Sequence, residues 1–352
     1  MNKNERTNQL ISIIVPCYNE EETVEIFYEE VERVTRDLPY QFEYIYVNDG
    51  SKDQTVTRVK EISQKDSRVK LIDFSRNFGK EAAMLAGLEY STGDAVVMMD
   101  VDLQDPPALL PQMIEYWEQG YDNIYTRRRN RDGEPPIRSF FAKQFYKIIN
   151  QISEVEIIDG ARDYRLFSRQ VVDDLLRLKE TNRFSKGLFS WVGYRGVCLE
   201  FDHVERIAGT TKWSFFKLFN YAVEGITSFS NSPLRLATYV GLFIAFTAFL
   251  YLLYIVFNTL IYGNAVEGWS STVCIILFLG GVQLLFLGVI GEYIGRIYTE
   301  SKRRPNYIVK EVLDCSYDNK WVNTLEKEER LQNRNLNNTQ YLNCKVVSNK
   351  SL

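Results

Sequence analysis

The sequence is poor in the side chains that build histidine or cysteine sites. It has 352 residues but a single histidine, His203, and its five cysteines form no C-x-x-C pair. One histidine alone does not provide a histidine-based metal centre or a Ser-His-Asp triad, so we expect His203 to be structural or on the surface. An odd number of scattered cysteines argues against a disulfide framework or a zinc site, and it fits a reducing cytosolic setting.

The sequence also lacks a strong net charge and an N-terminal apolar segment. The formal net charge is −4, so a broad electrostatic grip on nucleic acid is excluded and no nucleic-acid partner is expected. The first residues, MNKNERTNQ, are polar, so no signal peptide is expected there. Hydrophobic residues make up 45% of the chain, enough for a full core in one large domain or two ordinary ones.

Short apolar runs alternate with helical patterns through the first hundred residues. Strands are predicted at 10–16, 42–53, 69–75 and 94–100, and helices at 20–38, 55–64 and 79–91. This alternation predicts an α/β fold with a mostly parallel sheet. Ligands of such sheets bind at the carboxyl ends of the strands, so we expect Pro16, Asp49 and Asp100 to converge on one edge.

Two long uncharged runs lie in the second half of the chain. Residues 236–266 and 268–291 contain no charged side chain, and each run exceeds the roughly 20 residues that span a bilayer. Soluble helices need a polar face, so two transmembrane helices are predicted at about 236–260 and 271–293. The connecting segment has no lysine or arginine, whereas Arg235 and Arg296 flank the runs. The positive-inside rule then places the N-terminal domain and both termini in the cytosol, at the plasma (inner) membrane.

These patterns predict five segments. They are a polar N-terminal tail (1–9), an α/β domain (10–212), a juxtamembrane amphipathic helix (213–233), a transmembrane hairpin (234–298) and a cytosolic polar tail (299–352) that is largely disordered after 314.

The stretch MMDVDLQDPP (98–107) places two carboxylates one residue apart directly after an apolar run. Because like charges at this distance repel, a positive group is expected between Asp100 and Asp102. Oxygen ligands suit Mg²⁺ or Mn²⁺, which would bridge a diphosphate and neutralise it as it leaves. The motif alone also fits a solvated acidic turn.

Seven motifs occur in a fixed order along the chain. They are IIVPCYNEEETV, YVNDGSKDQT, SRNFGKEAA, MMDVDLQDPP, DGARDYRLFSRQ, NRFSKGLFSWVGY and ERIAGTTKWSFFKL. Together they resemble the family 2 glycosyltransferases, which have a GT-A (Rossmann-like) fold. Over about residues 10–305 the chain is similar to the polyprenyl-phosphate branch, which includes dolichyl-phosphate mannose synthase and bacterial bactoprenol glucosyltransferases. The Q-x-x-R-W motif of processive polysaccharide synthases is absent, which argues against polymerisation.

The resemblance implies a donor site. The residues matched to nucleotide-sugar binding are Pro16, Tyr18, Glu20, Asp49, Asp100, Gln104, Arg206 and Lys212. The residues matched to metal ligands are Asp100, Asp102 and Gln104, for Mg²⁺ or Mn²⁺. Lys80, near a predicted helix start, either contacts phosphate or is a surface lysine.

The resemblance also implies an acceptor side. Asp163 matches the carboxylate assigned as catalytic base, and Asp102 belongs to the catalytic set through the metal. Arg165 holds Asp163, contacts the acceptor phosphate or forms a structural ion pair. Arg127 and Arg138 match arginines that receive the acceptor phosphate.

The expected reaction is inverting transfer of one sugar from a UDP-sugar to undecaprenyl (polyprenyl) phosphate at the cytosolic membrane face, which makes a lipid-linked donor for cell-envelope glycans. Glucose is expected ahead of N-acetylglucosamine. A phosphate monoester is largely a dianion at neutral pH, so Asp163 is expected to orient the acceptor more than to remove a proton. The alternatives are a GDP-mannose-dependent enzyme and a catalytically silent membrane scaffold, and a homo-oligomer is also possible.

Overall fold

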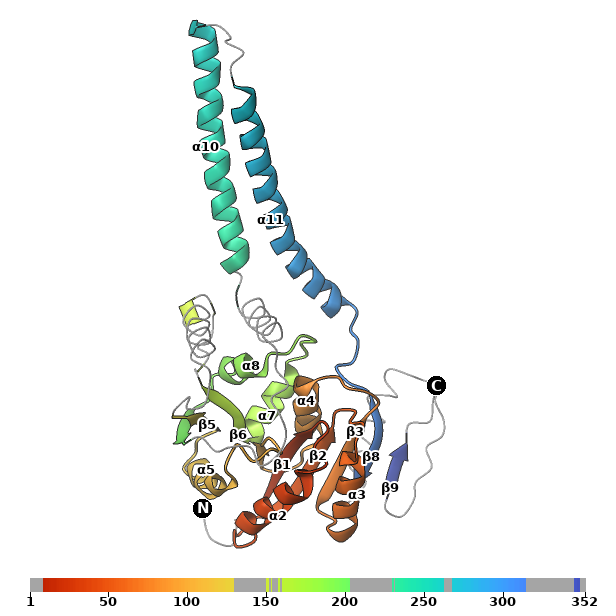
Figure 1. Ribbon diagram of the computed structural model, residues 1–352. Coiled ribbons are helices and arrows are strands. Elements are labelled where there is room, and N and C mark those ends of the chain that lie inside the picture. The colour runs from red at the N-terminus through yellow and green to blue at the C-terminus, as the bar shows by residue number, and fades with distance from the viewer. Residues whose placement is uncertain are drawn as a thin grey trace.

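The computed structural model describes residues 9–129, 150–151, 153, 158, 160–202, 230, 232–262, 268–314 and 345–348. They form an α/β domain and a pair of long helices that projects from it (Figure 1). The strands are β1 (Leu10–Cys17), β2 (Gln41–Asn48), β3 (Val69–Phe74), β4 (Ala95–Met98), β5 (Asn123–Arg128), β6 (Ala161–Ser168), β7 (Gly196–Phe201), β8 (Val309–Asp314) and β9 (Lys345–Ser348). The helices are α2 (Val24–Thr35), α3 (Thr55–Lys65), α4 (Lys80–Tyr90), the short 3-10 helix η1 (Pro107–Leu109), α5 (Leu110–Glu118), α7 (Arg169–Arg177), α8 (Ser185–Trp191), α10 (Ser232–Tyr262) and α11 (Trp269–Ser301).

In the part of the chain that the structure describes, one sheet holds nine strands in the order β7-β5-β6-β4-β1-β2-β3-β8-β9. The central strands β4, β1, β2 and β3 are parallel. They are the four strands that the apolar runs predicted, and the α/β fold is confirmed. On the two flanks, β6 and β8 run antiparallel to their neighbours, which the alternation of strands and helices did not predict.

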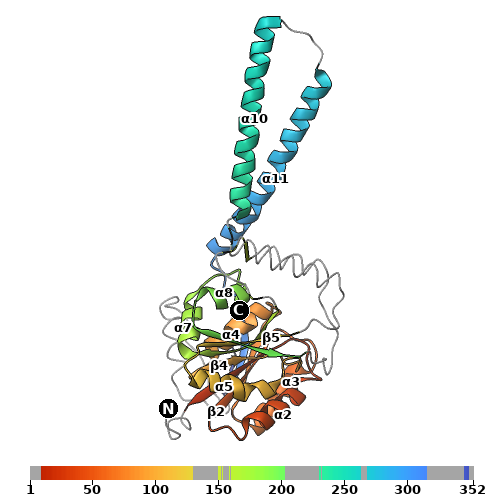
Figure 2. The same ribbon diagram turned by 90° about the vertical axis from the view of Figure 1, so that its left-hand side faces the viewer.

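Helices cover both faces of the sheet, so the central strands are apolar on both sides. One buried cluster packs α2, α3 and α5 against Ile11, Ile13 and Val15 of β1. The other packs α4, α7 and α8 against alternate residues such as Ile14. Figure 2 shows these helices on the opposite side of the sheet from α2 and α5. Helix α4 lies so close to β1 that a Cβ on Gly87 would meet Ile14 at 2.1 Å. A larger residue at 87 would therefore push α4 away from the sheet.

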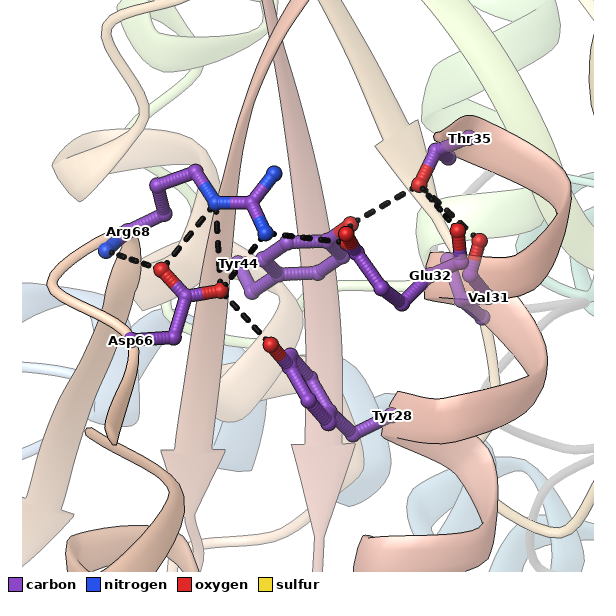
Figure 3. A network of polar contacts seen from close by, with 7 residues as sticks. All are labelled: Tyr28, Val31, Glu32, Thr35, Tyr44, Asp66 and Arg68. Atoms are coloured by element: carbon purple, nitrogen blue, oxygen red, sulfur yellow. Dashed lines mark hydrogen bonds and ion pairs between the residues drawn. The ribbon is translucent and has the colours of Figure 1, made fainter. Parts of the chain in front are cut away.

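A polar network fastens α2 to the amino-terminal side of the sheet (Figure 3). Tyr28 donates a 2.7 Å hydrogen bond to Asp66, which also accepts from Arg68. Arg68 lies 3.0 Å from Glu32, and Glu32 accepts a 2.8 Å hydrogen bond from the Tyr44 hydroxyl. The network therefore joins a helix, a strand and the turn before β3, on the edge away from the carboxyl ends of the parallel strands.

The two long helices α10 and α11 correspond to the predicted transmembrane segments and extend beyond them at both ends. Each contains a window long and apolar enough to cross a membrane, Leu234–Tyr251 and Phe278–Ser301, and neither window is buried. The hairpin stands away from the sheet in both views (Figures 1 and 2). Its end is attached to the domain through Glu300, which accepts a 2.8 Å hydrogen bond from the backbone N–H of Thr181.

After the hairpin the chain returns to the sheet. Strand β8 pairs antiparallel with β3, and β9 pairs antiparallel with β8. Sequence analysis assigned both segments to a polar tail and predicted neither strand. The intervening residues 315–344, most of the juxtamembrane segment 213–233 and the loop 130–149 lie outside the described residues.

Candidate active site

The loops after β1 and β2 form one rim at the carboxyl edge of the sheet. The backbone N–H of Asn19 donates a 2.9 Å hydrogen bond to Ser51, and the Lys52 N–H donates one of 2.9 Å to Asn19. The Glu20 N–H donates to Thr55 at 2.8 Å. The rim thus fixes the segment that carries the predicted residues Pro16, Tyr18 and Glu20.

Asp49 follows β2 and lies almost fully buried, 4% exposed. Its carboxylate accepts hydrogen bonds from the backbone N–H groups of Phe78, at 2.6 Å, and Gly79, at 3.0 Å. Burial raises the pKa of Asp49, although these two hydrogen bonds oppose the rise. Its neighbour Gly50 has φ 66°, and a Cβ there would meet the Arg76 backbone at 2.4 Å. Asp49 therefore joins the end of β2 to the loop before α4.

Asp100 and Asp163 lie across from each other because of strand register. Strands β4 and β6 pair antiparallel with Met98 opposite Arg165. Continuing that register by two residues brings Asp100 opposite Asp163. Lys80, the first residue of α4, lies between them, with its Nζ 2.6 Å from Asp100 Oδ1 and 2.6 Å from Asp163 Oδ2. The sequence predicted a positive group between Asp100 and Asp102, whereas Lys80, from the SRNFGKEAA segment, lies between Asp100 and Asp163.

The electrostatics of this centre favour the charged forms. Burial alone would raise the pKa of Asp163, but the ammonium groups of Lys80 and Lys186 lower it well below its usual range. Burial alone would lower the pKa of Lys80, and the two carboxylates raise it above its usual range. Asp163 is therefore ionised at neutral pH, and a carboxylate with a lowered pKa is a weak proton acceptor.

A second ion pair supports the same edge. Asp105 is fully buried and lies 2.8 Å from Arg162 Nε, which comes from β6. Burial raises the pKa of Asp105, and the Arg162 guanidinium only partly offsets this. Successive side chains of β6 point to opposite faces of the sheet. Arg162 therefore meets Asp105 on one face, and Asp163 meets Lys80 on the other. Sequence analysis assigned no role to Arg162 or Asp105. In the sequence, only their positions within the motifs MMDVDLQDPP and DGARDYRLFSRQ pointed to a role at the site.

Within the D-x-D turn, Asp102 and Gln104 have local partners. Asp102 is 7% exposed, and its Oδ1 accepts a 3.2 Å hydrogen bond from the Gln104 N–H. The Gln104 Oε1 accepts a 3.1 Å hydrogen bond from Arg128. Leu103 between them has φ 54°, in the left-handed region. The chain therefore turns directly after β4 instead of continuing as a strand.

Arg165 lies beneath the site. It is 2% exposed, its guanidinium lies 5.2 Å from the Tyr125 ring centroid and 4.9 Å from that of Phe189, and its Nε donates to the Arg162 carbonyl at 3.2 Å. Burial lowers its pKa to about 10. Within the described part of the chain it forms no ion pair with Asp163. Arg165 is therefore packed between aromatic rings, two residues along β6 from Asp163.

Of the four remaining basic residues predicted to bind phosphate groups, the structure describes one. Arg127, on β5, is half-buried and pairs with Glu200 of β7. Arg138, Arg206 and Lys212 lie outside the described residues.

The donor set of the D-x-D turn fits a divalent cation held jointly with a ligand. Among the described residues no group of three or more histidine, cysteine or acidic side chains forms a complete metal cage. Magnesium sites, however, commonly use one or two carboxylates together with substrate phosphates. Asp100 is partly open, at 23% exposure of its side chain, and Asp102 lies two residues away. These two carboxylates would hold the ion together with donor phosphate oxygens.

The comparisons with known proteins agree with this architecture. Residues 12–176 match the glycosyl transferase family 2 model, and residues 232–297 match a model described as the GtrB C-terminal hairpin. The bactoprenol glucosyl transferase of Shigella phage SfV is 47% identical over 300 residues, which cover 85% of this chain and 98% of the relative. The chain belongs to glycosyl transferase family 2. A prophage bactoprenol glucosyl transferase homolog of Escherichia coli (strain K12) is 46% identical over 302 residues, 86% of this chain and 99% of that one.

This family 2 member is therefore a glycosyltransferase with a GT-A fold, as the ordered motifs predicted. The hairpin match and the exposed apolar faces of α10 and α11 indicate that it associates with a membrane. A solved structure of glucosyl-3-phosphoglycerate synthase from Mycobacterium tuberculosis, in complex with Mn²⁺, UDP-glucose and phosphoglyceric acid, is a distant neighbour. It is 17% identical with a TM-score of 0.42, over 64% of this chain and 80% of that one.

Proposed function

We propose that this enzyme transfers one glucose from UDP-glucose to a polyprenyl phosphate such as undecaprenyl phosphate. The observation that carries the proposal is the 47% identity to bactoprenol glucosyl transferases over nearly their whole length. The Lys80-bridged carboxylates at the sheet edge supply a charged centre suited to joining two anionic substrates. The product would be a lipid-linked glucose, a donor for modification of cell-envelope glycans.

In the proposed reaction an acceptor phosphate oxygen attacks the anomeric carbon of glucose. A carbon–oxygen bond to that phosphate forms as the bond from the anomeric carbon to the diphosphate breaks. Attack from the face opposite the diphosphate inverts the anomeric configuration, and UDP leaves with the bonding electrons. The acceptor is already largely a dianion at neutral pH, so little proton removal is needed.

The role proposed for Asp163 is to position groups on the acceptor side. Its lowered pKa makes it a weak base, and it holds the Lys80 ammonium 2.6 Å away. That ammonium lies between the carboxylate proposed for the donor side and the one proposed for the acceptor side. Arg127 and Arg138 are proposed to receive the acceptor phosphate, and Arg206 and Lys212 to bind the diphosphate.

Asp100 and Asp102, with Gln104, are the residues proposed to hold Mg²⁺ or Mn²⁺. When bound, the ion would neutralise charge on the diphosphate leaving group. Chelation tests this assignment. EDTA should abolish transfer, and added Mn²⁺ or Mg²⁺ should restore it, whereas full activity in EDTA would refute it.

The proposed orientation has the sheet domain and both termini in the cytosol at the plasma membrane. The support is the asymmetry of charge, with Arg235 and Arg296 flanking the uncharged runs and no lysine or arginine between them. A cysteine introduced at Ala265 should be labelled from outside intact cells, and one introduced in the segment after Lys310 should not. The opposite labelling would contradict a cytosolic active site.

A donor screen tests the proposed function. Purified full-length protein in detergent is mixed with a short-chain polyprenyl phosphate and, separately, UDP-glucose, UDP-N-acetylglucosamine or GDP-mannose, and the lipid is analysed by mass spectrometry. The expected product is a lipid phosphate carrying one hexose, formed with UDP-glucose. Product formed with GDP-mannose alone would establish the mannosyl alternative, and no product with any donor would support the silent scaffold.

A further inference from the structure

A cleft of about 720 Å³ lies at the carboxyl edge of the sheet. It opens between the loop after β2, with Gly50 and Asp53, and the loop after β3, with Ser75 and Arg76. Tyr18, which follows β1, also lines it. These loops belong to the edge where ligands of parallel sheets bind.

The far wall of this cleft comes from β8, the strand that follows the membrane hairpin. Lys310 and Glu311 of β8 line the cleft. The strand is tied to the end of β3, where the Ser75 N–H donates a 3.0 Å hydrogen bond to the Ile308 carbonyl. The Tyr307 ring stacks on Phe74 with centroids 4.8 Å apart. Residues 302–308 alone separate this wall from α11.

Lys310 is the β8 side chain best placed to meet a ligand. Its ammonium lies 3.1 Å from the carboxylate of Asp73, whose side chain is only 4% exposed, while 65% of the Lys310 side chain is exposed. Asp73 also accepts a 2.7 Å hydrogen bond from Asn48. The ion pair with Asp73 therefore holds the Lys310 ammonium in place. An ammonium has three N–H donors, and Asp73 is its one partner among the described residues, so donors are left for a ligand in the cleft.

The strand order indicates which part of the donor lies here. Asp100 follows β4, and β8 is four strands further along the sheet, in the order β4-β1-β2-β3-β8. Four spacings of about 4.8 Å put β8 roughly 19 Å from β4. The Lys310 ammonium lies nearer, because it pairs with Asp73 of β3. The cleft already begins at Tyr18, after the neighbouring strand β1, so a nucleotide-sugar with its diphosphate at Asp100 would reach the cleft with its nucleoside.

We propose that β8 forms the outer wall of the donor pocket and that Lys310 donates a hydrogen bond to the nucleoside part of the donor, its base carbonyl or ribose. This inference rests on the proposed function, because it takes the donor to be a nucleotide-sugar. It makes the strand after the membrane hairpin a specificity-determining part of the soluble domain.

The test compares Lys310→Met with a matched variant, Lys70→Met. Lys70 also ties β3 to β8, through a 3.0 Å ion pair with Asp314, but it does not line the cleft. Isothermal titration of the full-length protein with UDP, and with GDP as a second probe, gives the dissociation constants. Lys310→Met should raise the constant for UDP roughly tenfold, the value expected for one lost charge-assisted hydrogen bond. Lys70→Met should change it less than twofold, and Lys310→Arg should keep most of the affinity.

Titration with UMP identifies the contacted group. A nucleoside contact predicts the same loss for UMP as for UDP, and a loss confined to UDP would overturn it. An unchanged UDP affinity in Lys310→Met, or equal losses in Lys310→Met and Lys70→Met, would also overturn the inference. These outcomes are separable from the proposed function. A wild-type protein that binds UDP but makes no glucosylated lipid refutes only the function, and one that makes the lipid while Lys310→Met binds UDP normally refutes only the role of Lys310.

Discussion

The amino-terminal edge and the carboxyl edge of the sheet carry the same kinds of charged and polar side chain, but these side chains have different roles. At the amino-terminal edge, Tyr28, Asp66, Arg68, Glu32 and Tyr44 bond to one another and join neighbouring elements (Figure 3). At the carboxyl edge, charged groups also pair, but a cleft of about 720 Å³ opens there between the loops that follow β2 and β3. The comparison teaches that residue type does not mark a site. A site is marked instead by the convergence of strand ends and by access for a ligand.

Substitution at the D-x-D motif should give the largest difference between the edges. Asp100→Ala should lower the transfer rate by on the order of 100- to 1,000-fold, because a group that stabilises the leaving diphosphate is lost. The melting temperature should change little, since Asp100 lies in a partly open turn. A steady-state assay with UDP-glucose and a melting curve check both expectations.

The mirror variant at the other edge is Asp66→Ala. It leaves the Tyr28 hydroxyl and the Arg68 guanidinium without their shared acceptor, so it should cost about 1–3 kcal/mol in the free energy of unfolding. Transfer by the folded fraction should match wild type. A large loss of activity in Asp66→Ala with unchanged stability would break the comparison.

Lys80 should show a smaller but clear effect. Lys80→Met leaves Asp100 and Asp163 facing each other without the ammonium, and the rate should fall about 10- to 100-fold. Lys80→Arg keeps the charge but changes its shape, so it should recover part of the rate. Equal activity in Lys80→Met and wild type would show that the bridge is only a surface ion pair.

Glu81, the next residue of α4, should reveal the smallest effect, one on stability. Burial is the main cause that raises its pKa, to about 7 from 4.5, while hydrogen bonds from Ser185 oppose the rise. The folded protein therefore retains a proton that the unfolded chain releases, and stability falls as pH rises from about 5 to 7. Glu81→Gln removes this dependence. Its stability relative to wild type should rise by about 1–2 kcal/mol across that range, measured by denaturant unfolding.

The parallel core of the fold could be predicted from sequence because its strands are buried on both faces and read as apolar runs. The convergence of Asp49 and Asp100 on one edge followed from that alternation. The hairpin was predictable too, since α10 and α11 carry long uncharged runs.

The rest depended on contacts between segments far apart in the chain. Strand β8 has the mixed sequence VKEVLD and is recognisable only through its pairing with β3. Lys80 read equally well as a surface lysine, because its partners Asp100 and Asp163 come together only through the register of β4 and β6. Arg165 was placed among charged partners, whereas its neighbours are aromatic rings that pattern alone did not reveal.

The rate of Asp163→Asn between pH 6 and 8 tests the central claim, a Lys80-bridged centre that positions an acceptor phosphate already ionised. The substrates are UDP-glucose and a short-chain polyprenyl phosphate, with hexose-bearing lipid measured by mass spectrometry. If Asp163 positions the acceptor, the variant should keep partial activity that rises with pH, because the second pKa of a phosphate monoester is about 6 and more acceptor becomes a dianion. A variant that binds both substrates normally yet is inactive at every pH would contradict the account and make Asp163 a general base.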